Sequence, residues 1–95
     1  MTRHELRVLT LNCWFDDYEQ DTRAEGLRKL IIDSAADIVM LQEVVPKLVR
    51  FLAARPDIAE RYMLSTAAAD ADQPTSAGGC DPYGVLMLVL RELGS

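Results

Sequence analysis

The feature that most constrains this 95-residue chain is an apolar run that ends in a carboxylate. Residues 38–44 read IVMLQEV, so four consecutive apolar side chains precede Gln42 and Glu43. A run of this length predicts a buried strand. Taking an ionised carboxylate out of water is costly unless a cation or hydrogen-bond donors meet it. Either the strand reaches the surface at Gln42, or Glu43 binds something positive.

The composition is that of one small domain or of part of a larger one. The chain is 49% hydrophobic and 26% charged, which is typical of a globular protein. Its formal net charge of -5 argues against a nucleic-acid interface built on a broad basic patch. A nucleic acid held in a small site by a metal ion stays compatible with this charge.

Targeting signals and metal-binding cysteine motifs are not visible in the sequence. No charged segment followed by an apolar one opens the chain, and no apolar run reaches the length of about 18 residues expected of a membrane span. Cys13 and Cys80 are too far apart for a CxxC motif. Two separate thiols fit a reducing compartment, so we expect structural cysteines and a cytoplasmic protein.

The hydrophobic pattern predicts an α/β fold in the order β-α-β-α-β-β. Apolar runs and alternation predict strands, and apolar residues at helical spacing predict helices. Strands are expected at 6–14, 38–44, 62–66 and 83–93, and helices at 23–36 and from Pro46 onward, with a possible further turn at 56–62. The sheet is expected to be mixed, with its helices on one face, and the whole chain 1–95 to form one partial domain.

Local signals refine these expectations. Thr22 and Glu25 have the spacing of a capping box, which predicts a helix start at residue 23. The first strand, 6–14, carries apolar groups on both faces, which predicts a central strand covered on two sides. Residues 67–82 are small and turn-rich, so we expect a mobile loop there.

Two polar side chains close the first two strands. Asn12 ends the first strand and Glu43 ends the second. In open α/β sheets, ligands gather beyond the carboxyl ends of parallel strands. An amide oxygen beside a carboxylate suits Mg²⁺, which prefers hard oxygen ligands. The competing interpretation is that the Gln-Glu pair marks only the point where the strand meets water.

The segments LRVLTLNCW and DIVMLQEV together resemble the opening of the endonuclease/exonuclease/phosphatase superfamily. The strand YGVLMLVLREL is similar to the family's G-x-x-x-x-x-x-R strand, at Gly84 and Arg91. The layout between the second and third strands is similar to that of tyrosyl-DNA phosphodiesterase-like members, while LNCW is closer to the neutral sphingomyelinase branch. The resemblance extends over residues 6–93.

The resemblance implies the N-terminal half of a four-layer α/β sandwich and a Mg²⁺-dependent phosphodiesterase or phosphomonoesterase, with Mn²⁺ as a possible substitute. It implies Glu43 as a principal metal ligand. It implies Asn12 as a catalytic and metal-site residue that contacts metal-bound phosphate. The family's Asp-x-Asn and Ser-Asp-His segments do not occur in this chain. The sole histidine, His4, matches no family position, so we expect the chain to be inactive alone.

Other polar residues carry weaker signals. Trp14 stands where tyrosyl-DNA phosphodiesterase-like members often have an acidic residue, and we expect it to contact the core. Asp16 and Asp17 could approach the site but fit an exposed loop better. Ser34, Ser65 and Ser76 have no nearby histidine that could activate them.

Two function classes therefore follow from the sequence. The first is an N-terminal fragment of a metal-dependent phosphoesterase, whose substrate is a nucleic acid, a lipid or a small phosphodiester. The second is a non-catalytic remnant or partner-binding fold. The strands are apolar on both faces while the helices can cover only one, so we also expect the isolated chain to self-associate.

Overall fold

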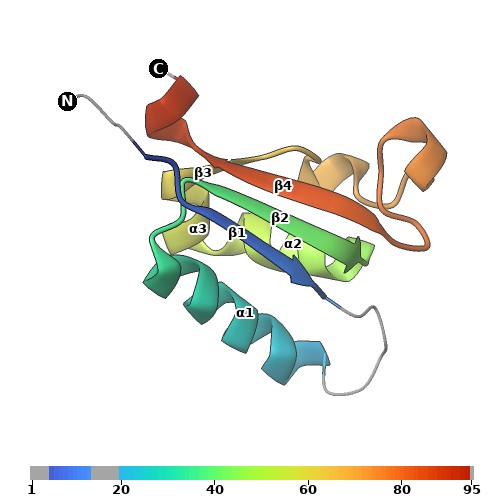
Figure 1. Cartoon of the computed structure of the whole chain (residues 1–95). Helices are drawn as coiled ribbons and strands as arrows, with labels where there is room; N and C mark the ends of the chain where they lie inside the picture. The colour runs from blue at the N-terminus through green and yellow to red at the C-terminus, as the bar shows by residue number, and fades with distance from the viewer. Residues whose placement is uncertain (1–4, 14–19, 95) are drawn as a thin grey trace.

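The computed structural model of the chain describes residues 5–13 and 20–94. Four strands form one sheet in the order β1-β2-β4-β3, and three helices accompany it (Figure 1). The elements are β1 (Val8–Asn12), α1 (Gln20–Ser34), β2 (Ile38–Val44), α2 (Pro46–Ala54), α3 (Pro56–Arg61), β3 (Tyr62–Leu64) and β4 (Gly84–Leu90). The predicted α/β class and the order of its elements are confirmed.

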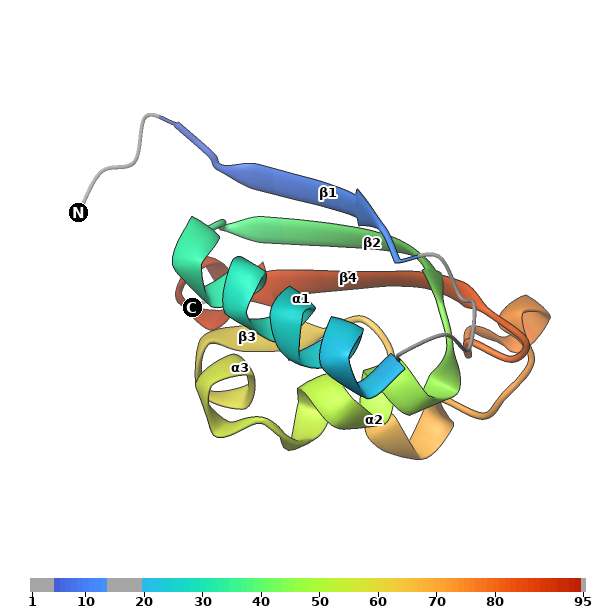
Figure 2. The ribbon, with the colours of Figure 1, turned by 90° about the horizontal axis from the view of Figure 1, so that it is seen from below.

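The sheet is mixed. Strands β1 and β2 are parallel, whereas β4 is antiparallel to both β2 and β3. All three helices lie on one side of the sheet, as Figure 2 shows in the view from below. The prediction of a mixed sheet with helices on one face is therefore confirmed.

The core lies between this helix-covered face and the helices. Alternate residues of β2 and β4 point to it because successive side chains of a strand face opposite sides. The sheet and the helices each contribute side chains that are fully buried. These are Val39, Leu41, Leu86 and Leu88 from the sheet, and Ile31, Val49, Leu52 and Ile58 from the helices.

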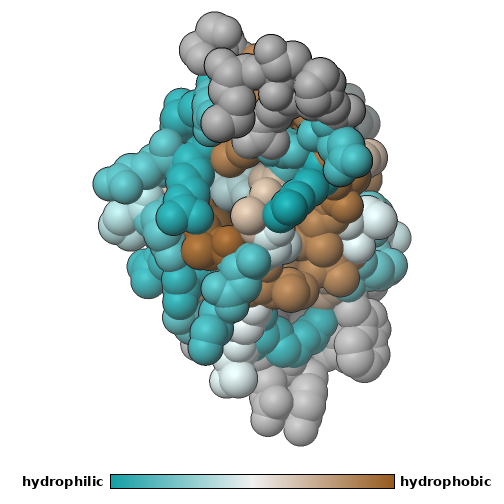
Figure 3. Space-filling model, turned by 60° about the vertical axis from the view of Figure 1, so that its left-hand side comes forward, coloured by the Kyte–Doolittle hydropathy of each residue, from teal (hydrophilic) through white to brown (hydrophobic). Residues whose placement is uncertain are grey.

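None of the described helices α1, α2 and α3 lies on the opposite face of the sheet, and we call this face the open face. The strand register places Val8, Ile38, Val89 and Met63 in one row across all four strands. Val8 is 56% exposed, and Val85 on β4 is 59% exposed. Figure 3, seen with the left-hand side of Figure 1 brought forward, shows hydrophobic areas at the surface with polar side chains between them.

The position of β1 differs from the prediction. It was expected to be a central strand, but it lies at one edge of the sheet and pairs with β2 alone. Its alternate residues Val8, Thr10 and Asn12 are exposed. Within the described residues, one face of β1 is therefore exposed and the other is half-buried.

Helix α1 also differs in its bounds from the predicted 23–36. It begins at Gln20, so Thr22 lies within the first turn and is not the capping residue. It ends at Ser34 because Ala35 takes a left-handed conformation, with φ of 52°. The Ser34 hydroxyl donates to the Ile31 carbonyl at 2.8 Å and accepts from the Ala36 amide at 3.2 Å. These bonds satisfy backbone groups that the end of a helix leaves unpaired.

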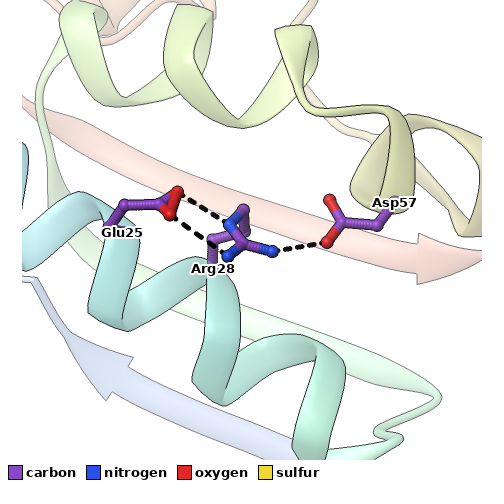
Figure 4. A network of polar contacts seen from close by, with 3 residues as sticks. All are labelled: Glu25, Arg28 and Asp57. Atoms are coloured by element: carbon purple, nitrogen blue, oxygen red, sulfur yellow. Dashed lines mark hydrogen bonds and ion pairs between the residues drawn. The ribbon is translucent and has the colours of Figure 1, made fainter.

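A charged network joins α1 to α3. The Arg28 guanidinium donates two hydrogen bonds to Glu25 on its own helix and one to Asp57 on α3 (Figure 4). Glu25 and Asp57 are both partly exposed, with side-chain exposures of 52% and 36%. Exposed ion pairs contribute little to stability, about 0–1 kcal/mol each, so the network adds little to the packing of α1 near α3.

The segment between β3 and β4 was predicted to be a mobile loop over residues 67–82, but backbone hydrogen bonds order it. The Cys80 amide donates to the Ala71 carbonyl at 3.0 Å, and the Asp81 amide donates to the Gln73 carbonyl at 3.1 Å. Ala71 and Cys80 are fully buried. A Cβ at Gly79 would lie 2.1 Å from the Gln73 carbonyl oxygen, so this crossing of the chain requires glycine.

Candidate functional site at the carboxyl ends of β1 and β2

The two residues singled out from the sequence lie at the same edge of the sheet. Asn12 is the register partner of Gln42, and Glu43 follows directly. The Cys13 amide donates to the Gln42 carbonyl at 2.8 Å, which extends the pairing one residue beyond β1. The structure therefore places Asn12 and Glu43 at neighbouring positions of this edge, while their roles as ligands stay predictions.

Glu43 lies in a β-bulge. Leu41 pairs with Leu86 but Val44 pairs with Gly84, so three steps along β2 match two steps along β4. Glu43 has φ of 55°, in the left-handed region that side-chain-bearing residues seldom adopt. Bulges of this kind change the direction of a side chain and are frequent beside active sites.

The bulge answers the question that the sequence raised. In an unbroken strand, Glu43 would share a face with Val39 and Leu41, and its carboxylate would point into the core. The extra residue instead returns Val44 to the core, where it is fully buried. Glu43 stays half-buried. The strand thus continues its apolar face without burying a charge in it.

The Glu43 carboxylate has no hydrogen-bond donor within residues 5–13 and 20–94. The Glu43 oxygens are not among the buried side-chain atoms that lack a partner, so water or a ligand can reach them. The backbone conformation of Glu43 is also strained, at a cost of about 1–3 kcal/mol. An unpartnered carboxylate on strained backbone is a frequent sign of a functional position.

The pKa of the neighbouring Cys13 thiol is affected by the charges at this edge. Burial raises the pKa of the Cys13 thiol to about 11, with a smaller lowering effect from the Arg23 guanidinium and a small raising effect from Glu43. The thiol is therefore protonated at neutral pH and is not a thiolate ligand. Arg23 and Glu43 both act on this side chain, so the two opposite charges lie at the same edge.

A hydrogen bond on the open face fixes the amide of Gln42. Its Nε2 donates to the Thr10 hydroxyl at 2.9 Å. Thr10 and Asn12 share a face of β1, and Gln42 is the register partner of Asn12. The hydrogen-bonded pair of Thr10 and Gln42 therefore lies next to Asn12 on the open face.

Arg23 is a residue of this edge that the sequence interpretation missed. Its Nη2 donates to the Cys13 carbonyl at 2.6 Å, so helix α1 is bonded to the chain directly after β1. Arg23 is half-buried. One signal could have found it, because a strand, a short loop and a helix place the first turn of that helix near the carboxyl end of the strand.

The donor set fits a hard divalent cation in part. The Glu43 carboxylate and the Asn12 amide oxygen are ligand types that Mg²⁺ prefers, and the protonated Cys13 thiol leaves the edge with oxygen donors. Within the part of the chain that the structure describes, no group of three or more His, Cys, Asp or Glu side chains could hold a metal. Two protein oxygens are compatible with Mg²⁺, which usually keeps several waters.

Comparison with known proteins decides the family. A family model described as Endonuclease/Exonuclease/phosphatase family matches residues 9–95. The chain belongs to this family. A search of curated proteins found no match.

Two solved structures share the fold of this Endonuclease/Exonuclease/phosphatase family member. One is the crystal structure of humanized D. rerio TDP2 by 14 mutations, with a TM-score of 0.70 and 22% identity over 92% of this chain and 30% of that chain. The other is D. rerio TDP2 complexed with single strand DNA product, with a TM-score of 0.69 and 20% identity over 95% of this chain and 31% of that one. The chain thus spans about a third of the length of these two structures.

Two further residues of the predicted family pattern lie at opposite ends of β4. Gly84 begins β4 and pairs with Val44 beside the bulge. A Cβ at Gly84 would lie 3.1 Å from the Gly79 carbonyl oxygen, so the site edge is tightly packed there. Arg91 follows β4 at its far end, where its Nε donates to the Ala59 carbonyl at 2.9 Å. Arg91 therefore lies away from Asn12 and Glu43.

The remaining candidates fall into two groups. His4, Trp14, Asp16 and Asp17 lie outside the described residues. Ser34 and Ser65 bond to backbone groups, Ser34 at the end of α1 and Ser65 to the Met87 amide at 2.9 Å. Among the described helices, none is long and apolar enough to cross a membrane.

Proposed function

We propose that this chain is the N-terminal part of a Mg²⁺-dependent phosphoesterase, with Mn²⁺ as a substitute. The observation that supports the proposal most strongly is Glu43, a half-buried carboxylate on left-handed backbone with no hydrogen-bond donor among the described residues. A cation near it would supply the missing partner. The family match makes phosphoester chemistry the setting for this site.

Each residue of the edge has a distinct role in the proposal. Glu43 holds the divalent cation, and Asn12 lies beside it as a second oxygen ligand that also orients the phosphate group. Gln42, fixed by Thr10, limits the movement of Asn12 through their shared register. A bound Mg²⁺ would supply polarisation of a phosphoryl oxygen and activation of water.

The proposed substrate class is a phosphodiester. One of the two similar structures is a TDP2 bound to a single strand DNA product, so single-stranded DNA is a substrate to test. The net charge of -5 makes a grip based on many phosphate contacts unfavourable. A nucleic acid would therefore be held at the metal rather than along a basic surface.

We further propose that the chain is inactive alone. It spans about a third of each TDP2 chain, and it carries neither the Asp-x-Asn nor the Ser-Asp-His segment. Removing single members of a catalytic group typically lowers turnover by orders of magnitude. The alternative function, a non-catalytic remnant or partner-binding fold, predicts that Glu43 binds no metal at all.

The test combines metal binding with turnover. Mn²⁺ binding to the 95-residue chain would be measured by electron paramagnetic resonance, and turnover with Mg²⁺ and Mn²⁺ on a chromogenic phosphodiester and on single-stranded DNA. We expect binding that Glu43→Gln removes, and no turnover. The exposed Asp33→Asn on α1 is the matched control and should bind Mn²⁺ normally.

Two results would contradict parts of the proposal. Absence of Mn²⁺ binding would favour the non-catalytic alternative. Robust turnover that Glu43→Gln abolishes would show that the chain carries a complete site. A parent reading frame that encodes Asp-x-Asn and Ser-Asp-His and is active with Mg²⁺ would support the proposal independently.

We also propose that the isolated chain self-associates through the open face. The row of Val8, Ile38, Val89 and Met63 continues into Val85 and Met87, and no described element covers it. Covering about 400 Å² of apolar surface would contribute on the order of 10 kcal/mol before the entropy of association is subtracted. The net charge of -5 opposes this only weakly at physiological salt.

Light scattering tests the self-association. Val85→Lys places a charge on the open face and should shift the chain toward a monomer. Leu30→Lys, at a 45% exposed apolar position on α1, should leave the distribution unchanged. A wild-type chain that is a monodisperse monomer and binds no hydrophobic dye would contradict the proposal.

A further inference from the structure

One hydrogen bond ties the helical layer to the candidate site. The Arg23 Nη2 of α1 donates to the Cys13 carbonyl at 2.6 Å, across ten residues of sequence. Cys13 directly follows Asn12, the last residue of β1. A charged donor to a backbone carbonyl makes a stronger hydrogen bond than a neutral one.

The peptide units on both sides of Cys13 are held from different elements. On its amide side, Cys13 donates to the Gln42 carbonyl of β2 at 2.8 Å. On its carbonyl side, it accepts from Arg23 of α1. β1 lies at the edge of the sheet and its other side has no strand partner among the described residues, so these bonds limit how far its end can fray.

We propose that Arg23 is a positioning residue for the site formed by Asn12 and Glu43. By holding the Cys13 carbonyl, it keeps the end of β1 against β2 and thereby keeps the Asn12 amide beside Glu43. The inference rests on the proposed metal role of that edge. It assigns Arg23 no contact with substrate or metal.

The direction in which Mn²⁺ affinity changes when Arg23 is removed distinguishes a positioning residue from a charge that merely lies near the site. A guanidinium near a cation site repels the cation, so removal of a bystander arginine should tighten Mn²⁺ binding. Removal of a positioning arginine should weaken Mn²⁺ binding, because the two oxygen ligands lose their fixed separation. Loss of a supporting hydrogen bond behind a metal ligand typically lowers metal affinity by about 10–100-fold.

Three variants of the 95-residue chain provide the test. Arg23→Met removes both the donor and the charge while keeping a long side chain, and Arg23→Lys restores a charged donor without the planar group. Arg28→Met is the matched control on the same helix, since its partners are Glu25 and Asp57 rather than the site. Mn²⁺ affinity and the hydrogen exchange rate of the Cys13 amide are measured for each.

We expect Arg23→Met to weaken Mn²⁺ binding roughly tenfold and to speed exchange of the Cys13 amide, with partial recovery in Arg23→Lys and no change in Arg28→Met. Unchanged or tighter Mn²⁺ binding in Arg23→Met overturns the proposal. If the wild-type chain binds no Mn²⁺, the proposed function fails instead. Exchange of the Cys13 amide then decides alone whether Arg23 holds the end of β1, and an unchanged rate overturns that role.

Discussion

The two ends of β2 each carry a carboxylate, and the structure treats the two in opposite ways. Asp37 precedes the strand and is fully buried. Its Oδ2 accepts from the Arg7 amide at 2.7 Å, while its own amide donates to the Arg7 carbonyl at 2.8 Å. The Leu90 amide donates to its carbonyl at 3.0 Å. Asp37 therefore ties the beginnings of β1 and β2 to the end of β4.

Glu43, at the other end, has none of this support. It is half-buried, lies in a bulge at φ of 55°, and receives no hydrogen bond from the described residues. A carboxylate that stabilises a fold is buried with its donors, as Asp37 is. A carboxylate that binds a ligand would need available oxygens, and the Glu43 oxygens accept no hydrogen bond from the described residues. The comparison separates a structural acid from a candidate functional one on a single strand.

The largest expected effect is at the Asp37 end. Asp37→Ala should lower the free energy of unfolding by about 2 kcal/mol, because the Arg7 amide loses a charged acceptor. Urea denaturation would measure the change. Asp33→Ala, which removes an exposed carboxylate from α1, should change it by less than about 0.5 kcal/mol. Equal changes in the free energy of unfolding for the two variants would contradict the structural role of Asp37.

The next effect concerns a tyrosine that supports the same end. The Tyr62 hydroxyl donates to the Ala36 carbonyl at 2.6 Å inside the core, so Tyr62→Phe should cost about 1 kcal/mol. Burial raises the pKa of Tyr62 above its ordinary value of about 10. The folded state therefore disfavours the tyrosinate. The stabilisation from Tyr62 should be fully present below the pKa that Tyr62 has in the unfolded chain. It should be lost as the pH rises through the higher pKa that Tyr62 has in the folded chain.

Denaturation between pH 8 and pH 11 tests this dependence, because the range brackets the ordinary tyrosine pKa of about 10. The wild-type chain should lose stability at the upper end of the range. Tyr62→Phe should lose less stability there, because residue 62 no longer titrates. The remaining loss comes from other groups that titrate in this range, such as the Cys13 thiol. An identical pH dependence in the two chains would contradict the assignment to Tyr62.

A smaller effect, of the opposite sign, is expected at the bulge. Glu43→Gly should stabilise the fold by about 0.5–1 kcal/mol, because glycine adopts positive φ without the strain of a side chain. Ala35→Gly, at φ of 52° after α1, is a matched test of the same strain without a carboxylate. Thermal unfolding would compare them. Destabilisation by Glu43→Gly alone would mean that the Glu43 side chain supports the fold.

The smallest effect on stability is expected for Glu43→Gln. It keeps the shape and the strained backbone and removes only the charge, so unfolding without metal should shift by less than about 0.5 kcal/mol in either direction. Melting with and without Mn²⁺ would show the contrast, because only the wild-type chain should gain stability from the metal. A large loss of stability without metal would make Glu43 a structural acid like Asp37.

Much of the fold was predictable from local patterns in the sequence. The order of strands and helices followed from apolar periodicity, and β2 was predicted at the residues where it occurs, 38–44. Pro46 was correctly placed at the start of α2, because proline suits the first turn of a helix. These signals are local, since they depend on side-chain spacing within one element.

Predictions that depended on neighbouring elements were less accurate. The exposed face of β1 follows from its place at the sheet edge, which no pattern within 6–14 encodes. The order in residues 67–82 comes from hydrogen bonds between positions such as Ala71 and Cys80. Small and turn-forming residues indicate that a loop occurs, but they do not reveal the contacts that hold it in one shape.

For the candidate site, the sequence by itself determined which residue types lie at the ends of the first two strands. Asn12 and Glu43 were identified because each follows an apolar run, and the family resemblance marked them further. Only the tertiary structure decided how Glu43 is presented. The bulge arises because β4 pairs with both Leu41 and Val44, and both of these side chains are buried in the core. This pairing joins segments that are some forty residues apart in the sequence. Arg23 likewise reaches Cys13 only because α1 lies against the sheet. The spacing of residues along the chain determines which side chains a strand carries at its end. The packing between strands and helices determines the direction in which each polar group points.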